Sequence, residues 1–354
     1  MADPAQSPFD QLRAKYSGEW PAIVRARQYT AGRLLALEPI KEFESDNTSV
    51  VLFGSFARGE LTPGSDVDWS LLIDGPSDPE HIRIMQEVGR SLEALGLQEP
   101  GTTQTFGTMV GSHDLIQNIG GLNDTNQNLT RRILLLLESL AVTNAIVRDR
   151  ILRGALNRYI DSDTSVAWHT RPDQVVPRFL LNDIVRFWRT MAVDYAAKRW
   201  EQSDRKWALR NAKLRMSRKL LFVSGLLLCF SFELYPPDEG EDIRSDPAMM
   251  APRLADFLLR QTSLTPLDLL SRELLRVDRP EITTRVMSSY DEFLALLADP
   301  DRRGHLEKLK FEGVASDEVF GQVRGLSHSF QDGLTSLFFD DKDLRDLIVK
   351  YGVF

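Results

Sequence analysis

Two aspartates separated by one residue, Asp66 and Asp68, are the residues whose spacing most directly suggests chemistry. They open the apolar run Asp66–Asp74, which has the composition of a β-strand. Residues two apart on a strand point to the same face, so both carboxylates should project together while Val67 turns into the core. Adjacent carboxylates repel each other unless a cation lies between them, and hard oxygen ligands suit Mg²⁺ or Mn²⁺.

A Gly-Ser pair lies upstream of these aspartates. Gly54 and Ser55 follow the apolar run Val50–Phe53 and lead into a segment that can begin a helix. Backbone N–H groups at such a turn, together with the serine hydroxyl, form a seat for phosphate. The sequence therefore predicts a site in which a glycine turn and carboxylate-bound metal hold the same phosphate, as attack on a nucleotide α-phosphate requires.

This pattern resembles the signature of the DNA polymerase β-like nucleotidyltransferase superfamily. The matching features are Gly54-Ser55, ten intervening residues and then Asp66-Val67-Asp68, followed by apolar residues. The longer segment GSFARGELTPGSDVDWSLL is similar to the corresponding segment of the uridylyltransferase group that modifies nitrogen-regulatory PII proteins. We expect the hydrolase and amino-acid-sensing domains of that group to be missing from this chain.

The resemblance implies roles for individual residues. Gly54 and Ser55 would hold the triphosphate of an NTP, and Asp66 and Asp68 would bind the catalytic Mg²⁺ or Mn²⁺ ions. A third carboxylate on a neighbouring strand usually completes such a site, although some members manage with the first pair.

The third carboxylate is not fixed by any motif. Asp114, which directly follows the apolar run Phe106–Val110, is the first candidate, and Glu99 is the rival. Arg58 is a further nucleotide-binding candidate, and the alternative is that it forms a solvated pair with Glu60.

Composition describes an ordinary globular protein. The chain has 354 residues, 42% of them hydrophobic, and a net charge of −8, which argues against general nucleic-acid coating. The single cysteine, Cys229, lies in the longest apolar run, Leu220–Phe232, and is expected to be a buried thiol. That run is shorter than the roughly 20 residues of a membrane span, and the N-terminus lacks a secretory pattern, so we expect a cytoplasmic protein without membrane contact.

One segment departs from the acidic balance. Residues 178–219 contain 12 Lys or Arg against 4 Asp or Glu. Lys213 and Lys219 are nucleotide-binding candidates because of their place in this basic island. The alternative is a solvated basic face that makes salt bridges. The island could also hold an RNA end.

The expected elements define an α+β fold, with a small mixed-sheet nucleotidyltransferase core followed by a large helical domain. Phe9–Phe43 reads as one helix, Val50–Phe53 and Asp66–Asp74 as strands, and Leu129–Tyr159 as a long helical stretch. The expected domains are residues 1–128, the catalytic core with its N-terminal helix, and residues 129–354, an all-helical substrate-binding or closing domain.

Together, these features predict a metal-dependent nucleotidyltransferase. It would transfer a nucleoside monophosphate from an NTP, ATP or UTP, to an acceptor hydroxyl, with a protein as the first choice of acceptor. The alternatives are a synthase of nucleotide second messengers, an RNA or small-molecule nucleotidyltransferase of defence or toxin type, and a non-catalytic nucleotide-binding module. Neither the acceptor nor the oligomeric state follows from the sequence.

Overall fold

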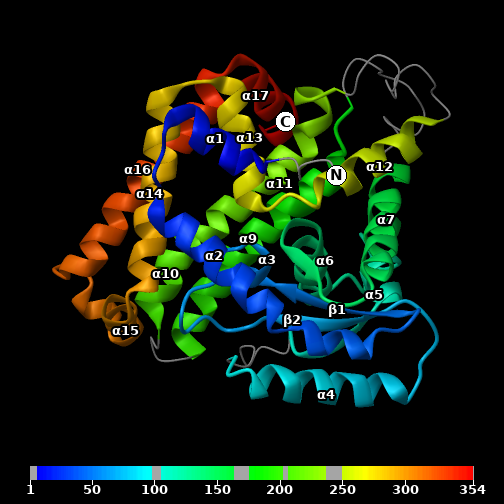
Figure 1. The fold of residues 1–354 in the computed structure, drawn as a ribbon. Coiled ribbons are helices and arrows are strands. Elements are labelled where there is room, and N and C mark those ends of the chain that lie inside the picture. The colour runs from blue at the N-terminus through cyan, green and yellow to red at the C-terminus, as the bar shows by residue number, and fades with distance from the viewer. Residues whose placement is uncertain (1–5, 98–104, 163–174, 202–205, 237–248, 354) are drawn as a thin grey trace. The chain divides into compact units, whose positions relative to one another are not determined.

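A small mixed sheet occupies the first half of the chain, and helices form most of the rest, which confirms the expected α+β class (Figure 1). The computed structural model describes residues 6–97, 105–162, 175–201, 206–236 and 249–353. The strands are β1 (Thr48–Phe53), β2 (Trp69–Ile73), β3 (Thr108–Gly111) and β4 (Ser139–Ala141). The α-helices are α1 (Pro8–Tyr16), α2 (Pro21–Leu35), α3 (Gly54–Ala57), α4 (Glu80–Ala94), α5 (Ser112–Ile116), α6 (Asn126–Leu137), α7 (Ala145–Asp161), α9 (Arg178–Glu201), α10 (Trp207–Arg215), α11 (Ser217–Leu234), α12 (Met250–Gln261), α13 (Pro266–Val277), α14 (Pro280–Ala298), α15 (Pro300–Lys308), α16 (Glu318–Asp340) and α17 (Lys342–Leu347). Shorter helical turns are η1 (Glu38–Phe43), η5 (Phe311–Gly313) and η6 (Ile348–Val353).

The chain divides into two units. The sheet unit comprises Gln28–Phe187 and Leu228–Thr265, and the helical unit comprises Met1–Arg27, Trp188–Leu227 and Pro266–Phe354. Helices α2, α9 and α11 each contribute residues to both units. The boundary expected at residue 128 rests on the change in sequence character, and it stays a prediction.

The strands of the sheet lie in the order β3-β2-β1-β4. β1 is antiparallel to both β2 and β4, whereas β2 and β3 are parallel. In the β1–β2 pair Leu52 lies opposite Trp69, so the turn after β1 and the residues before β2 meet at one end of the sheet. That end carries the Gly-Ser turn and the two aspartates.

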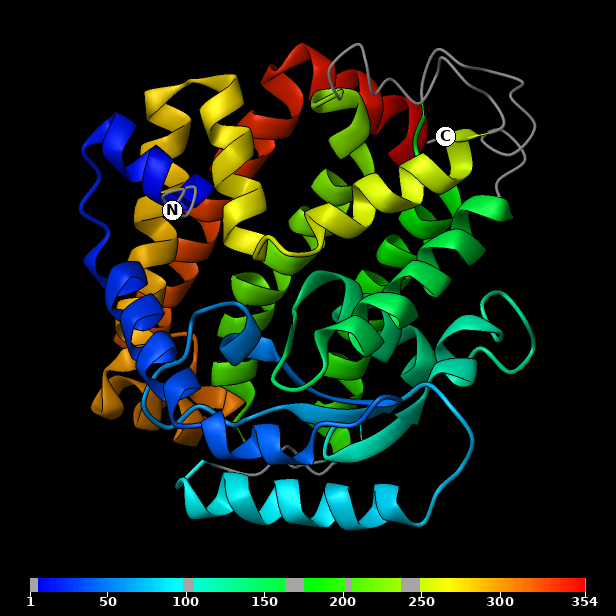
Figure 2. The same cartoon turned by 45° about the vertical axis from the view of Figure 1, so that its right-hand side comes forward.

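Both faces of the sheet are covered within its own unit. Helix α4 runs along one face, and α6 and α7 lie on the opposite side, as both views show (Figures 1 and 2). Ile84, Val88 and Leu92 recur every four residues on α4 and belong to the same core as Val50 and Leu52 of β1. Burial on both sides explains why all six residues of β1 are buried.

The N-terminal helix expected over Phe9–Phe43 is interrupted twice, so that part of the prediction is wrong. Ser17 adopts a left-handed backbone with φ 50°, and Pro21 begins α2. Proline fits the first position of a helix but disfavours a helical residue before it, so the two segments cannot form one continuous helix. The turn η1, with Pro39 near its start, follows α2 for the same reason.

A strand interrupts the helix expected over Leu129–Tyr159. Helix α6 ends at Leu137, and β4 then pairs with β1, with Leu140 opposite Leu52. Three residues are too few to show the two-residue hydrophobic alternation of a strand. Their extended conformation therefore depends on pairing with β1.

The apolar run Leu220–Phe232 forms part of α11, and Cys229 is buried within it, as expected. Burial raises the pKa of the Cys229 thiol well above its ordinary value, which keeps the thiol neutral. Among the described helices, none combines the length and apolar character needed to cross a membrane.

Candidate active site

Gly54 lies where β1 ends, and its backbone is in the left-handed region with φ +65°. A Cβ at this position would lie 3.1 Å from Oδ2 of Asp68. The Phe53 N–H also donates to the Asp68 carbonyl at 2.8 Å, which holds the two segments together. Both the backbone angle and the adjacent carboxylate therefore favour glycine here.

The aspartate pair has the side-chain alternation expected from the sequence. Val67 is 1% exposed, whereas Asp68 is half-buried and Asp66 is exposed. Strand β2 begins at Trp69, so the aspartates precede the strand and do not form its first residues. They lie on the segment that leads into β2, beside the turn at Gly54.

This donor set fits a magnesium ion. Mg²⁺ is commonly held by one or two protein carboxylates, with substrate phosphates and water completing its octahedral shell. Asp66 and Asp68 supply two such carboxylates at a partly exposed position. Within the described part of the chain, no cluster of three or more His, Cys, Asp or Glu could hold a metal.

Ser55 follows Gly54 on the short helix α3 and is half-buried. Its carbonyl accepts a hydrogen bond of 2.8 Å from the Glu60 N–H. Gly59, with φ +71°, reverses the chain between these residues. Because α3 has only four residues, its dipole is small, so an anion at this turn would have to be held by turn N–H groups and the Ser55 hydroxyl.

Arg58 ends α3 and is buried, with 7% of its surface exposed. Its Nε donates to Oε2 of Glu60 at 2.7 Å, and its Nη1 forms a short ion pair with Oε2 of Glu138. The alternative of a solvated Arg58–Glu60 pair is therefore wrong, because the pair is buried. Direct nucleotide binding by Arg58 stays a prediction, and two of its nitrogen atoms already contact carboxylates.

Asp114 lies on α5 and is exposed; the Asn118 side-chain amide is 3.5 Å from its Oδ1. Strands β2 and β3 are parallel, with Ile73 opposite Gly111, so Asp114 follows the far end of β2. Asp68 directly precedes Trp69, the first residue of β2. At 3.3 Å per residue, β2 spans about 13 Å between the end beside Asp68 and the end beside Asp114. This placement argues against Asp114 as a ligand of ions held by Asp66 and Asp68.

The N-terminal end of β3, which pairs with the start of β2, is held by aromatic and backbone contacts. Phe106 packs against Phe53, with ring centroids 5.1 Å apart, and the Gly107 N–H donates to the Trp69 carbonyl at 2.7 Å. Arg131 donates to the Thr105 carbonyl at 2.9 Å. Glu99, the rival third carboxylate, lies outside the described residues.

Lys213 and Lys219 belong to the helical unit, whereas the candidates between Gly54 and Asp114 belong to the sheet unit. Lys213 lies on α10 and Lys219 on α11, and both are half-buried. Burial lowers the pKa of Lys219, and the nearby charge of Arg215 lowers it further. Nucleotide binding by these lysines stays a prediction.

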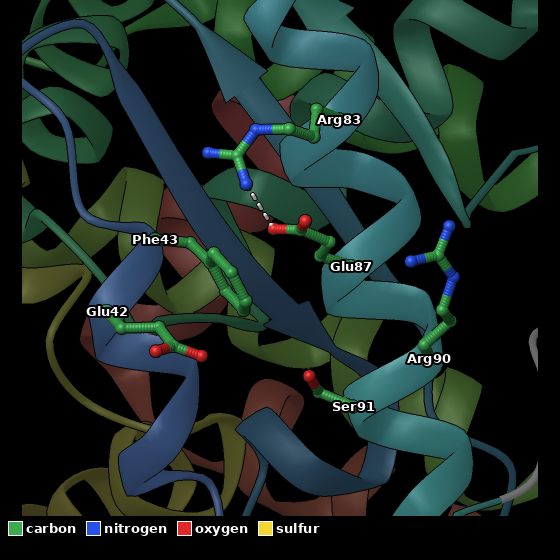
Figure 3. Close-up of a pocket in the computed structure, with 6 residues that line it drawn as sticks. All are labelled: Glu42, Phe43, Arg83, Glu87, Arg90 and Ser91. Carbon is green, nitrogen blue, oxygen red and sulfur yellow. Dashed lines mark hydrogen bonds and ion pairs between the residues drawn. The ribbon is translucent and has the colours of Figure 1, made fainter.

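A surface pocket of about 460 Å³ lies between η1 and α4 in the sheet unit. It is lined by Glu42, Phe43, Arg83, Glu87, Arg90 and Ser91, and an ion pair joins Arg83 to Glu87 (Figure 3). None of the candidate residues lines this pocket, and its mixed charges do not indicate a phosphate site.

Glu138 is the residue near the candidate site that sequence reasoning missed. It caps the C-terminus of α6, is 2% exposed and contacts Arg58. The available signal was an acidic residue directly after the apolar run 133–137, because a carboxylate in such a run needs a buried partner. Nothing in the sequence indicated that Arg58 is that partner.

Residues 36–103 match the family model described as Nucleotidyltransferase domain. The match covers the Gly54 turn and the Asp66–Asp68 pair, and it supports a nucleotidyltransferase enzyme with an NTP substrate. No curated protein and no solved structure is significantly similar to the chain.

Proposed function

Starting from a nucleotidyltransferase domain at residues 36–103, we propose that this enzyme transfers a nucleoside monophosphate from ATP or UTP to an acceptor hydroxyl. The position of the Asp68 carboxylate, 3.1 Å from where a Cβ at the left-handed Gly54 would lie, carries the proposal. It brings a phosphate-binding turn and a metal-binding carboxylate together within one small region. That juxtaposition is what nucleotidyl transfer needs, since one phosphate chain must meet both.

In the proposed reaction, the oxygen of the acceptor hydroxyl attacks the α-phosphorus, and the hydroxyl proton is released to water. The bond from that phosphorus to the oxygen bridging to the β-phosphate breaks, and pyrophosphate leaves. Gly54 and Ser55 would hold the phosphate oxygens through turn N–H groups and the Ser55 hydroxyl, while Asp66 and Asp68 would hold Mg²⁺. When bound, the ion neutralises charge that develops on the phosphate and leaving group.

The proposed acceptor is a protein hydroxyl. The segment Gly54–Leu72 resembles that of a group that modifies a protein, and the net charge of −8 disfavours broad affinity for nucleic acid. A nucleotide, an RNA end and a small molecule are the alternatives, and each gives a different labelled product.

A labelling experiment tests the function. The protein is incubated with each α-labelled NTP and Mg²⁺ or Mn²⁺ in a cell extract, beside Asp66→Asn and Asp68→Asn variants. We expect label to migrate with protein for the wild type alone. Label in RNA or in a small product would identify RNA or a small molecule as the acceptor in place of a protein. Equal labelling by wild type and variants would contradict the enzymatic role.

Gly54→Ala should weaken Mg²⁺-dependent nucleotide binding about tenfold, or about 1.4 kcal/mol. The new Cβ would crowd Oδ2 of Asp68, and a left-handed backbone costs a non-glycine residue about 1–2 kcal/mol. Gly96→Ala is the matched control, because Gly96 has φ +68° with no atom within 4 Å of an added Cβ. Both variants should lose stability in thermal unfolding, and only Gly54→Ala should lose affinity in titration calorimetry. Equal affinities would contradict the role of this contact.

Asp114→Asn should retain transfer activity within about threefold of the wild type, which is less than 1 kcal/mol in barrier height. The residue is exposed and lies beyond the far end of β2. Steady-state rates of pyrophosphate release provide the measurement. A loss of a hundredfold or more would restore Asp114 as the third carboxylate.

A further inference from the structure

A buried group of three charged residues lies behind the Gly54–Ser55 turn. Arg58 contacts Glu60 and Glu138, and all three residues are less than 9% exposed. All belong to the sheet unit, where α3 lies beside β1 and β4. A charge buried at this depth is stable only when it is paired, so each member depends on the others.

This group is connected to the turn through the backbone. The Glu60 N–H donates to the Ser55 carbonyl at 2.8 Å, and the Arg58 N–H donates to the Gly54 carbonyl at 3.0 Å. Glu138 directly precedes Ser139, which pairs with Phe53, the residue before Gly54. The two glutamates are therefore linked to the turn through different backbone segments, and Arg58 joins their side chains.

The charges of the group favour a mechanical role over phosphate contact. Two carboxylates surround one guanidinium, so the group carries no excess positive charge for a phosphate to meet. Arg58 is also buried, and it presents Nε and Nη1 to carboxylate oxygens. A guanidinium that bridges two carboxylates fixes their geometry through directed, charge-assisted hydrogen bonds.

We propose that Glu138 is a positioning residue that acts through Arg58 to hold the Gly54–Ser55 turn in the conformation that receives the NTP triphosphate. The inference rests on the proposed function, because it assigns the turn to the triphosphate. Arg58 then belongs behind the turn and makes no contact with the nucleotide. The carboxylate of Glu138 comes from a segment more than 80 positions downstream of the turn.

Two conservative variants test this role. Glu138→Gln keeps the shape of the side chain and removes its charge, and Arg58→Lys keeps the charge but lacks the planar guanidinium that presents Nε and Nη1 in fixed directions to two carboxylates. Mg²⁺-dependent binding of non-hydrolysable ATP and UTP analogues is measured by calorimetry. Amide hydrogen exchange of a peptide covering residues 54–61 is measured without nucleotide. Both variants should weaken nucleotide binding about tenfold and speed exchange in this peptide about tenfold.

Asp183→Asn is the matched control. Asp183 accepts a 2.9 Å hydrogen bond from Arg132 in another buried ion pair of the sheet unit, and among the residues that the structure describes its side chain hydrogen-bonds to Arg132 and Tyr159 and not to the Gly54 turn. This variant should lower the melting temperature while leaving nucleotide affinity and exchange in residues 54–61 unchanged. A melting temperature, by itself, cannot separate a positioning role from a structural one, whereas the local exchange can.

The outcomes are separable. If Asp183→Asn weakens binding and speeds exchange in residues 54–61 as much as Glu138→Gln does, the positioning role is overturned. Unchanged exchange in both Glu138→Gln and Arg58→Lys overturns it as well. If the wild type binds no nucleotide analogue, the proposed function fails, while faster exchange confined to the Glu138 and Arg58 variants still supports control of the turn.

Discussion

Asparagine in place of Asp68 is expected to slow nucleotidyl transfer about a thousandfold or more, equivalent to about 4 kcal/mol in the activation barrier. Oδ2 of Asp68 lies 3.1 Å from where a Cβ at Gly54 would be, beside the turn where the triphosphate is proposed to bind. Asparagine has nearly the same shape as aspartate but no charge. A bound Mg²⁺ would therefore lose a hard anionic ligand and would no longer be held in the same position. Asp66→Asn should have a similar effect, because Asp66 supplies the other carboxylate of the pair.

The rate is measured as pyrophosphate release at saturating NTP over a range of Mg²⁺ concentrations. Asp74→Asn is the control, since Asp74 directly follows the opposite end of β2 and pairs at the surface with Arg150. It should retain nearly full activity. An Asp68→Asn variant with more than a tenth of the wild-type rate at all Mg²⁺ concentrations would contradict the assignment.

The local part of the candidate site could be predicted from the sequence. Gly54, Ser55, Asp66 and Asp68 lie close together in the chain, and one antiparallel pair of strands brings them together. The alternation of Val67 with the aspartates follows from strand geometry alone. Such short-range features depend on few tertiary contacts, which explains why the sequence alone predicts them.

The direction of β3 relative to β2 could not be predicted from the sequence. Asp114 follows β3, and its distance from the aspartate pair depends on whether β3 runs parallel or antiparallel to β2. The observed parallel pairing sends Asp114 to the far end of the sheet. An antiparallel pairing would have placed the same residue near Asp68, and an apolar run of a few residues does not distinguish the two.

Contacts between distant segments were also beyond the sequence. Arg58 was expected to bind nucleotide, yet its partner Glu138 comes from the end of α6. The break between α6 and α7 was missed because β4 forms by pairing with β1. Each of these features depends on tertiary packing, which overrides the local helical pattern.

Arg132→Met is expected to destabilise the sheet unit by about 3–5 kcal/mol, because Asp124 and Asp183 lose the cation that is buried with them, and the partly exposed Arg186 remains beside them. Arg132 is 1% exposed and donates to both oxygens of Asp124 at 3.1 and 3.0 Å. It also donates to Asp183 at 2.9 Å and to the Tyr159 hydroxyl at 2.6 Å. At about 2–4 °C per kcal/mol for a unit of this size, the melting temperature should fall by about 10 °C.

Arg150→Met provides the control, since Arg150 makes an ion pair with Asp74 but its side chain is half exposed. Surface pairs contribute about 0–1 kcal/mol, so this variant should melt close to the wild type. Equal melting temperatures for Arg132→Met and the wild type would contradict the assigned burial cost.

The triple variant Arg132→Met, Asp124→Asn, Asp183→Asn separates lost packing from uncompensated charge. Burial opposes ionisation of Asp124, but the hydrogen bonds and charge of Arg132, with the Gly120 N–H and the charge of Arg186, outweigh it and lower the pKa of Asp124. Without Arg132 the largest part of that compensation is lost, and neutral asparagines remove the charges that it balanced. The triple variant should therefore regain part of the stability lost by Arg132→Met, because removing the three buried charges together costs less than removing the arginine alone, and Arg186, which remains, is partly exposed to solvent. If it regains none, the loss arises from packing around the arginine side chain.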